Sequence, residues 1–273
     1  MRRHGWMAIV CVALIVFLTY IPFVYVLDNS FKSGAQYVLH PLSIMWTFHP
    51  ANYSSAWAGM NQYLGNTVLV AFVTVLIGIP AAAMGSYAFA QLQFRLKPLL
   101  FYCFVALLMI PWTLTLIPLF IEVHDFGLFD TWWALILPYA AGSQPLLIFL
   151  FRVFFEGIPG ELYESARLDG CGEVGILVRI VTPLSIPILL TGAILMVNNV
   201  WGDYLWPTLV LRNYQALTVS AGMQVFIGSL GINVNGAGPQ FAAYVITMVP
   251  IMLLIAFTMR YFVRGMTNGA LKM

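Results

Sequence analysis

Six long apolar runs constrain this 273-residue chain more than any other feature of its sequence. A helix needs about 20 apolar residues to cross the hydrocarbon core of a bilayer, which is about 30 Å thick. Only 8% of the residues are charged, whereas soluble domains carry about 25%. We therefore predict an all-α integral membrane protein with six transmembrane helices, at residues 6–27, 67–90, 99–121, 132–151, 184–206 and 241–263.

The first run is predicted to stay in the protein as a transmembrane helix. It follows the basic pair Arg2-Arg3 and is about 22 residues long, whereas the apolar region of a cleaved signal peptide has about 7–15 residues. No pattern of small residues typical of a cleavage site follows it. We expect the N-terminus in the cytoplasm.

The distribution of Lys and Arg predicts the orientation, because these residues accumulate in cytoplasmic loops. With the N-terminus inside, the outer segments hold only Lys32 and Arg212. Both termini are thus expected in the cytoplasm. The expected divisions are 1–65 (first span and outer loop), 66–263 (the core transmembrane domain, with a polar loop at 156–183) and 264–273 (a cytoplasmic tail). The ten predicted cytoplasmic residues are Arg2, Arg3, Arg95, Lys97, Arg152, Arg167, Arg179, Arg260, Arg264 and Lys272.

The polar loop between the fourth and fifth spans concentrates charge: seven of the chain's 12 basic and 10 acidic residues lie between Glu156 and Arg179. Pro159 suits the first turn of a helix, and Gly170 suits its end about 11 residues later. Such a helix is too short to span a bilayer. A second short helix is expected at 173–181, before Pro183.

The loop therefore reads as a cytoplasmic helix-turn-helix that continues into the fifth span, with Pro187 in its first turn. The alternative is an ordinary solvated loop. Apolar residues alternate with the charges, and an exposed surface of that kind is typical of a partner-binding site.

The loop also contains G-x-G-x-x-G at Gly170, Gly172 and Gly175. A dinucleotide site needs this pattern inside a βαβ unit, and here a polar helix precedes it and a span follows.

Residues 164–171, Glu-Ser-Ala-Arg-Leu-Asp-Gly-Cys, resemble the cytoplasmic E-A-A-x-x-D-G-A motif of binding-protein-dependent ABC importer permeases. The family pattern continues at Leu177, at Ile180 and at residues 182–187, Thr-Pro-Leu-Ser-Ile-Pro. Ser165, Cys171, Leu177 and Thr182 depart from the family's usual residues. The chain resembles the carbohydrate-uptake branch, and in particular its maltose-permease-G-like subunits, at residues 30–32, 52–53, 87–90, 127–131, 201–203 and 265–272.

The resemblance implies a transport subunit with no catalytic site, cofactor or metal of its own. The motif would dock on an ATP-hydrolysing subunit, and two such subunits would bind ATP and Mg²⁺. A second, homologous permease, an extracytoplasmic substrate-binding protein and the lipid of the bacterial inner membrane are the other implied partners. The implied ATPase-coupling residues are Glu164, Ser165, Ala166, Asp169, Gly170 and Cys171. A turn between two short helices at Gly170 also favours a residue that can adopt a positive φ.

Two absences agree with this expectation. No G-x-x-x-x-G-K-[ST] phosphate-binding motif occurs, so the chain has no nucleotide site of that kind. Its three cysteines are scattered, and its histidines do not have metal-ligand spacing.

The best candidates for the substrate pathway lie near the end of the fifth span: Asn198, Asn199, Trp201 and Asp203. Polar groups in a span normally face the bundle interior or a watery cavity. Amides and an aromatic ring also suit the hydroxyls and apolar faces of sugars. The alternative is that these residues cap the helix at the membrane surface.

Other transport functions stay open at this stage. A secondary, ion-coupled transporter normally carries ionisable residues at mid-membrane, which these spans lack. A passive channel leaves the polar loop unexplained, and an intramembrane protease has no H-E-x-x-H or G-x-S-x-G motif here. For the importer, a sugar or oligosaccharide is the expected cargo, with a polyol or glycerol phosphate as alternatives. The aromatic-rich first outer loop, 28–65, fits either membrane anchoring or docking of a binding protein.

Overall fold

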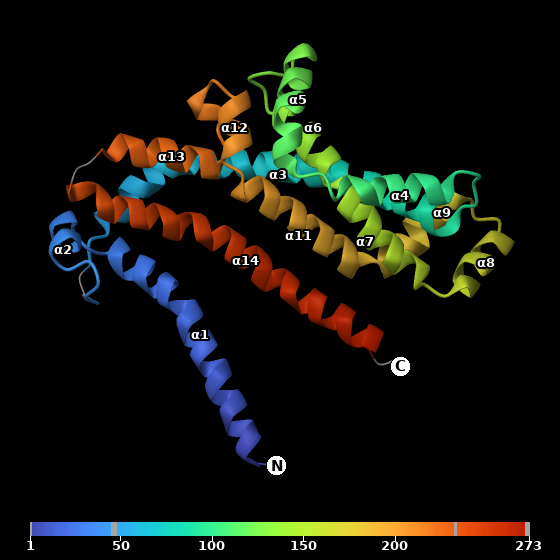
Figure 1. Ribbon diagram of the computed structural model, residues 1–273, viewed down its shortest axis with the longest axis horizontal. Helices are drawn as coiled ribbons and strands as arrows, with labels where there is room; N and C mark the ends of the chain where they lie inside the picture. Colours follow the sequence, from blue (N-terminus) through green and yellow to red (C-terminus); the bar gives the residue numbers. More distant parts are fainter. Residues whose placement is uncertain (1, 45–47, 232–233, 271–273) are drawn as a thin grey trace. The chain divides into compact units, whose positions relative to one another are not determined.

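The computed structural model describes residues 2–44, 48–231 and 234–270, and these residues form helices and turns without a β-strand (Figure 1). Of the residues used in the topology prediction, Lys272 lies outside the described part of the chain. The chain forms two compact units, Met1–Leu64 with Gly222–Ile251, and Gly65–Ala221 with Met252–Met273. The sequence does not indicate that residues 222–251 belong with the first unit. The three-part division expected from the sequence stays a prediction.

Three segments are each long and apolar enough to cross a membrane as one helix: Ile9–Ser30, Ala51–Gln91 and Ala237–Met259. The first belongs to α1 (Arg2–Ser30), the second is α3, and the third belongs to α14 (Ala237–Ala270). All three overlap predicted spans. Apolar side chains along α1 are exposed within the chain, as expected for a helix covered by lipid or by another subunit.

Three further predicted spans are bent helix pairs. They are α4 (Lys97–Leu107) with α5 (Trp112–Asp125) at 100°, α6 (Trp133–Gly142) with α7 (Gln144–Glu156) at 42°, and Glu173–Leu184 with α11 (Ile186–Gly202) at 83°. If each pair is one span, the total is six. The apolar run at 99–121 predicts one continuous helix. The structure breaks it at Pro111, the N-cap of α5, because proline has no N–H to continue the helical hydrogen bonds.

α3 begins at Ala51, inside the segment predicted as an outer loop. Gly59 and Tyr63 of α3 pack on α13 (Val219–Leu230), where glycines let the two helices approach closely. A Cβ added at Gly59 would lie 2.4 Å from the Phe226 ring, and one at Gly222 would lie 2.2 Å from the Tyr63 ring. Small residues at helix contacts of this kind are typical of membrane proteins.

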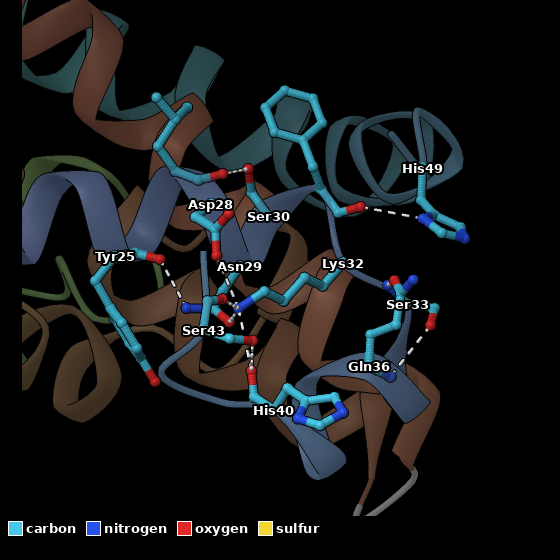
Figure 2. A network of polar contacts seen from close by, with 12 residues as sticks. Tyr25, Asp28, Asn29, Ser30, Lys32, Ser33, Gln36, His40, Ser43 and His49 are labelled. Carbon is cyan, nitrogen blue, oxygen red and sulfur yellow. Dashed lines mark hydrogen bonds and ion pairs between the residues drawn. The ribbon is translucent and has the colours of Figure 1, made fainter. Parts of the chain in front are cut away.

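A buried lysine organises the connection between α1 and α3 (Figure 2). Lys32 has no exposed surface, and its Nζ lies 2.7 Å from Asp28 Oδ2. The same ammonium donates to Asn29 Oδ1 at 3.0 Å and to the Ser43 carbonyl at 2.6 Å. The amide of Asn52 donates to the carbonyls of Ser30 and Lys32, both at 2.9 Å. Residues 30–32 and 52–53, which the sequence analysis matched separately, thus meet in one network around the short helix α2 (Gly34–Leu39).

The core of the second unit joins the C-terminal part of α3 to α7, to the polar loop and to α11. Figure 1 shows α7 alongside α4 and α11, and these helices are in contact. Apolar side chains, several of them aromatic, fill the core, and the polar loop contributes six of them. The cluster includes Tyr87, Leu147, Phe151, Phe155 and Met196, with Ile158, Tyr163, Ala166, Ile176, Leu177 and Val181 from the loop.

Candidate functional site

The polar loop begins with α8 (Gly160–Leu168), which ends in a glycine turn. Gly170 has φ +77°, so the sequence-based expectation of a positive φ there is confirmed. Its N–H donates to the Arg167 carbonyl at 3.1 Å, and the N–H of Cys171 donates to the Ala166 carbonyl at 2.9 Å. This pair of hydrogen bonds is the Schellman motif, which satisfies carbonyls that the helix end leaves open.

One face of α8 belongs to the core. Tyr163 is 1% exposed and Ala166 is 6% exposed. The Tyr163 hydroxyl donates to the carbonyl of Phe155 at 3.0 Å, which joins α8 to the last turn of α7. Ala166, which the resemblance assigned to ATPase coupling, therefore packs inward, and its small side chain allows α8 to lie close to the core.

The second half of the loop is helical but not uniformly α. After α9 (Glu173–Ile176) comes a π-helical turn, η1 (Leu177–Val181), and then α10 (Thr182–Leu184). The sequence predicts one short helix at 173–181 and gives no sign of the π turn. The chain then bends at Ser185, and α11 starts with Pro187 in its first turn, as predicted.

A polar cluster ties both short helices to α3. The Tyr87 hydroxyl donates to the Glu173 carboxylate. The Arg167 guanidinium donates to the same carboxylate, with Nε 3.0 Å from Oε1. Tyr87 comes from α3, Arg167 from α8 and Glu173 from α9. The sequence analysis did not assign Tyr87 or Glu173 to this site, although Tyr87 lies in a family-like segment and Glu173 in the charged block.

The opposite face of the loop is exposed and mixes carboxylates with apolar side chains. Leu168 is 88% exposed and Val174 is 77% exposed. Glu164, Ser165 and Asp169 are exposed beside them in the sequence. We call the set Glu164, Ser165, Leu168, Asp169 and Val174 the exposed loop face. An apolar surface rimmed by charged residues is typical of a protein-binding site.

The end of α11 contributes to a pocket of about 270 Å³, lined by Trp112, Pro138, Tyr139, Gly142, Asn199 and Asp203. Asp203 Oδ2 accepts a hydrogen bond from the Tyr139 hydroxyl at 2.9 Å. Its Oδ1 accepts from the N–H groups of Leu205 at 2.9 Å and Trp206 at 3.2 Å. Asp203 therefore caps the short helix α12 (Leu205–Val210) and also lines the pocket.

The four residues predicted for the substrate pathway thus fall into two groups. Asn199 and Asp203 line the pocket, whereas Asn198 is exposed and does not. Trp201 is half-buried, and its carbonyl accepts a hydrogen bond from Ser220. The pocket residues Trp112 and Tyr139 were not predicted, because they lie on α5 and α6 and only the fold brings them to α11. Among the described residues, no group of three His, Cys, Asp or Glu side chains could hold a metal ion.

Comparison with known proteins identifies the class. Residues 75–268 match the family described as "Binding-protein-dependent transport system inner membrane component". The chain belongs to this family and is an ABC importer permease, as the resemblance implied. Members of the family are membrane-embedded transport subunits, not enzymes.

Three relatives align along nearly the whole chain. "Probable ABC transporter permease protein YurM" of Bacillus subtilis is 33% identical, and the alignment covers 99% of this chain and 91% of the relative. "Arabinooligosaccharides transport system permease protein AraQ" of Halalkalibacterium halodurans is 32% identical, with coverages of 98% and 96%. "Melibiose/raffinose/stachyose import permease protein MelC" of Bacillus subtilis is 30% identical, with coverages of 95% and 94%.

A solved structure has the same fold. A chain of the "bacterial ABC transporter involved in the import of the acidic polysaccharide alginate" superposes with a TM-score of 0.84 at 21% identity. The match covers 96% of this chain and 97% of that one. At this identity the likeness establishes the fold and leaves the cargo open.

Proposed function

We propose that this chain moves a sugar or oligosaccharide across the bacterial inner membrane by alternating access, as one of two permeases in an ATP-driven importer. An extracytoplasmic binding protein delivers the cargo. Two separate subunits bind ATP and Mg²⁺, and their closure drives the change of access. The printed names of two relatives, for arabinooligosaccharides and for melibiose, raffinose and stachyose, support a carbohydrate cargo.

The proposed topology has six spans, counting each bent helix pair as one, with both termini in the cytoplasm. The lengths and composition of the helices are compatible with this count. The excess of Lys and Arg in the predicted inner segments supports the orientation. In this topology the polar loop faces the cytoplasm and the α5–α6 connection faces outward.

The observation that carries the coupling proposal is the division of the polar loop into two faces. Tyr163 and Ala166 anchor one face in the core of α3 and α7, whereas Leu168 and Val174 stand exposed on the other. A partner that pushes on the exposed loop face therefore pushes on an element with a rigid connection to α3, α7 and α11. Glu164 and Asp169 add negative charge that suits a basic surface on the ATPase. Gly170 sets the turn, and Ser165 and Cys171 flank these residues.

The proposal is tested by isolating the tagged chain from its native host in lipid nanodiscs and identifying the proteins that stay bound. We expect an ATPase, a second permease and a binding protein. Glu164→Lys and Gly170→Pro should lose the ATPase. Asp125→Lys is the matched control, because Asp125 is exposed but lies at the end of α5, on the proposed outer side.

Uptake measurements complete the test. Wild-type membranes should accumulate the saccharide bound by the co-purifying binding protein only when ATP is supplied. Isolation of the wild-type chain without any ATPase would contradict the proposed function. Uptake by the chain alone, driven by an ion gradient, would also contradict it and would favour the alternative function of a secondary, ion-coupled transporter.

A further inference from the structure

The pocket between α5, α6 and α11 has the composition of a site for a single sugar ring. Its volume of about 270 Å³ is slightly below the range of roughly 300–1,000 Å³ typical of pockets for small molecules. It combines an aromatic side chain with a few convergent polar groups. We propose that this pocket receives one neutral pyranose ring of the cargo and disfavours sugars that carry a carboxylate or phosphate. This inference rests on the proposed function, because it concerns the cargo of the same pathway.

Trp112 offers the apolar surface. Its ring meets that of Trp206 edge-on, with centroids 6.1 Å apart and planes at 81°. Trp206 is fully buried, and its Nε1–H donates to the Ala134 carbonyl at 2.9 Å, so this support is rigid. Trp112 itself is 41% exposed and lines the pocket. A tryptophan held in this way can present a fixed aromatic face to the C–H groups of a pyranose.

Two side chains offer hydrogen bonds to hydroxyl groups. Asp203 Oδ2 accepts one hydrogen bond, from Tyr139, and a carboxylate oxygen can accept a second. Asn199 is exposed, and its amide forms no hydrogen bond with any described residue. That amide can both donate and accept. A sugar hydroxyl, which also donates and accepts, therefore finds complementary partners on both Asn199 and Asp203.

Charge decides between classes of cargo. Asp203 is the only acidic residue among the six lining residues, and none of the six is basic. An anionic group in so small a pocket would lie close to the Asp203 carboxylate, in surroundings that screen charge less than water does. The fold is shared with a chain of an alginate importer, whose cargo is described as acidic. The lining of this pocket therefore disfavours acidic cargo in this protein, a difference that the shared fold does not indicate.

The test uses matched pairs of probes that differ only at C6: methyl glucoside against methyl glucuronide, and methyl galactoside against methyl galacturonide. Saturation-transfer NMR would measure their binding to the intact complex in nanodiscs, without sugar-based detergents. The variants are Trp112→Ala and Asp203→Asn. The asparagine oxygen can still accept from Leu205 and Trp206, so this variant keeps the cap of α12. It removes the charge and places an N–H2 group, which can donate to the Tyr139 hydroxyl, where Oδ2 accepted from that hydroxyl. Trp57→Ala is the control, because Trp57 is similarly exposed, at 56%, and lies on α3.

We expect at least one neutral pyranoside to bind, and Trp112→Ala but not Trp57→Ala to abolish that binding. The matching uronide should bind about tenfold more weakly to the wild type, and Asp203→Asn should remove most of this difference. Equal binding of both members of each pair, unchanged binding in Trp112→Ala, or no binding of any neutral probe would each overturn the inference. The co-purifying ATPase serves as the independent readout of the proposed function. If the ATPase is present in all variants, any of these results overturns the inference about the pocket without contradicting the proposed function.

Discussion

The hydroxyl of Tyr87, on α3, donates a hydrogen bond to the carboxylate of Glu173, the first residue of α9. Arg167 of α8 donates to the same carboxylate, so three helices meet at one group. The contact lies beside the buried face of the loop, since the rings of Tyr87 and Tyr163 are 6.4 Å apart. The exposed loop face is thus joined to α3 by a polar contact as well as by apolar packing.

Removing the Tyr87 hydroxyl tests this connection. Tyr87→Phe keeps the packed ring and loses the hydrogen bond to a charged acceptor, which is worth about 1.5–3 kcal/mol. We expect the midpoint of thermal unfolding in nanodiscs to fall by roughly 3–10 °C. Tyr102→Phe, at a tyrosine that is 69% exposed on α4, should leave the midpoint unchanged. An equal shift in both variants would show that the Tyr87–Glu173 bond contributes nothing specific.

The two glycines around the turn provide a matched pair. Neither Gly170 nor Gly172 has an atom within 4 Å of an added Cβ, but Gly170 has φ +77° and Gly172 has φ −71°. Gly170→Ala should therefore destabilise the folded chain by about 1 kcal/mol through backbone strain. Gly172→Ala should leave the stability unchanged or raise it by up to about 1 kcal/mol, because its φ suits any residue. Denaturation of the two variants side by side checks the difference, and similar losses would rule out the backbone explanation.

Asp130 makes a pH-sensitive contact between the loop before α6 and the segment after α12. Its Oδ1 accepts hydrogen bonds from the N–H groups of Arg212 at 2.8 Å and Asn213 at 3.0 Å. These two hydrogen bonds hold the pKa of Asp130 below its ordinary value, and the bond from Asn213 has the larger effect. Because the folded-state pKa is depressed, the stabilisation is complete above the unfolded-state pKa of about 3.9. It is lost as the pH falls below that value and through the folded-state pKa.

Hydrogen exchange at the amides of Arg212 and Asn213 measures this loss directly. After correction for intrinsic rates, protection in the wild type should fall as the pH drops below about 4. Asp130→Asn keeps an acceptor oxygen and tolerates the φ of 61° at this position, so its protection should not change with pH. Asp125→Asn should behave as the wild type does. A pH-dependent loss that persists in Asp130→Asn would assign the titration to another group.

The buried ammonium of Lys32 is expected to be essential for the connection between α1 and α3. Lys32→Met leaves the carboxylate of Asp28 and the carbonyl of Ser43 without this donor (Figure 2). Breaking a buried ion pair in this way costs about 3–5 kcal/mol. Proteolysis within residues 33–44 should accelerate strongly. The double variant Asp28→Asn with Lys32→Met should recover part of the loss, since the negative charge that Lys32 neutralises is then removed together with the lysine. A double variant as labile as the single one would contradict this account.

Much of the helical architecture could be predicted from local features of the sequence. The apolar runs predict helices near all six expected positions, because a helix that enters lipid must satisfy its own backbone and expose apolar side chains. Pro159, Gly170 and Pro187 predicted the start of α8, its end and the first turn of α11. Pro111 lies inside a long apolar run, and the sequence analysis read that run as one helix. The run is equally apolar with or without the 100° break, so hydropathy does not distinguish the two.

The sequence by itself therefore determined the class of protein, the approximate helices and the turn at Gly170, since these depend on residues close together in the chain. Only the tertiary structure decided which face of the polar loop is exposed. Ala166 and Leu168 are two residues apart, yet one packs on the core and the other is 88% exposed. The structure alone brings Trp112, Tyr139 and Asp203 to one pocket, because they lie on α5, on α6 and just after α11, tens of residues apart in the chain. Packing between distant segments makes such sites, and a pattern along the chain does not specify which segments will meet.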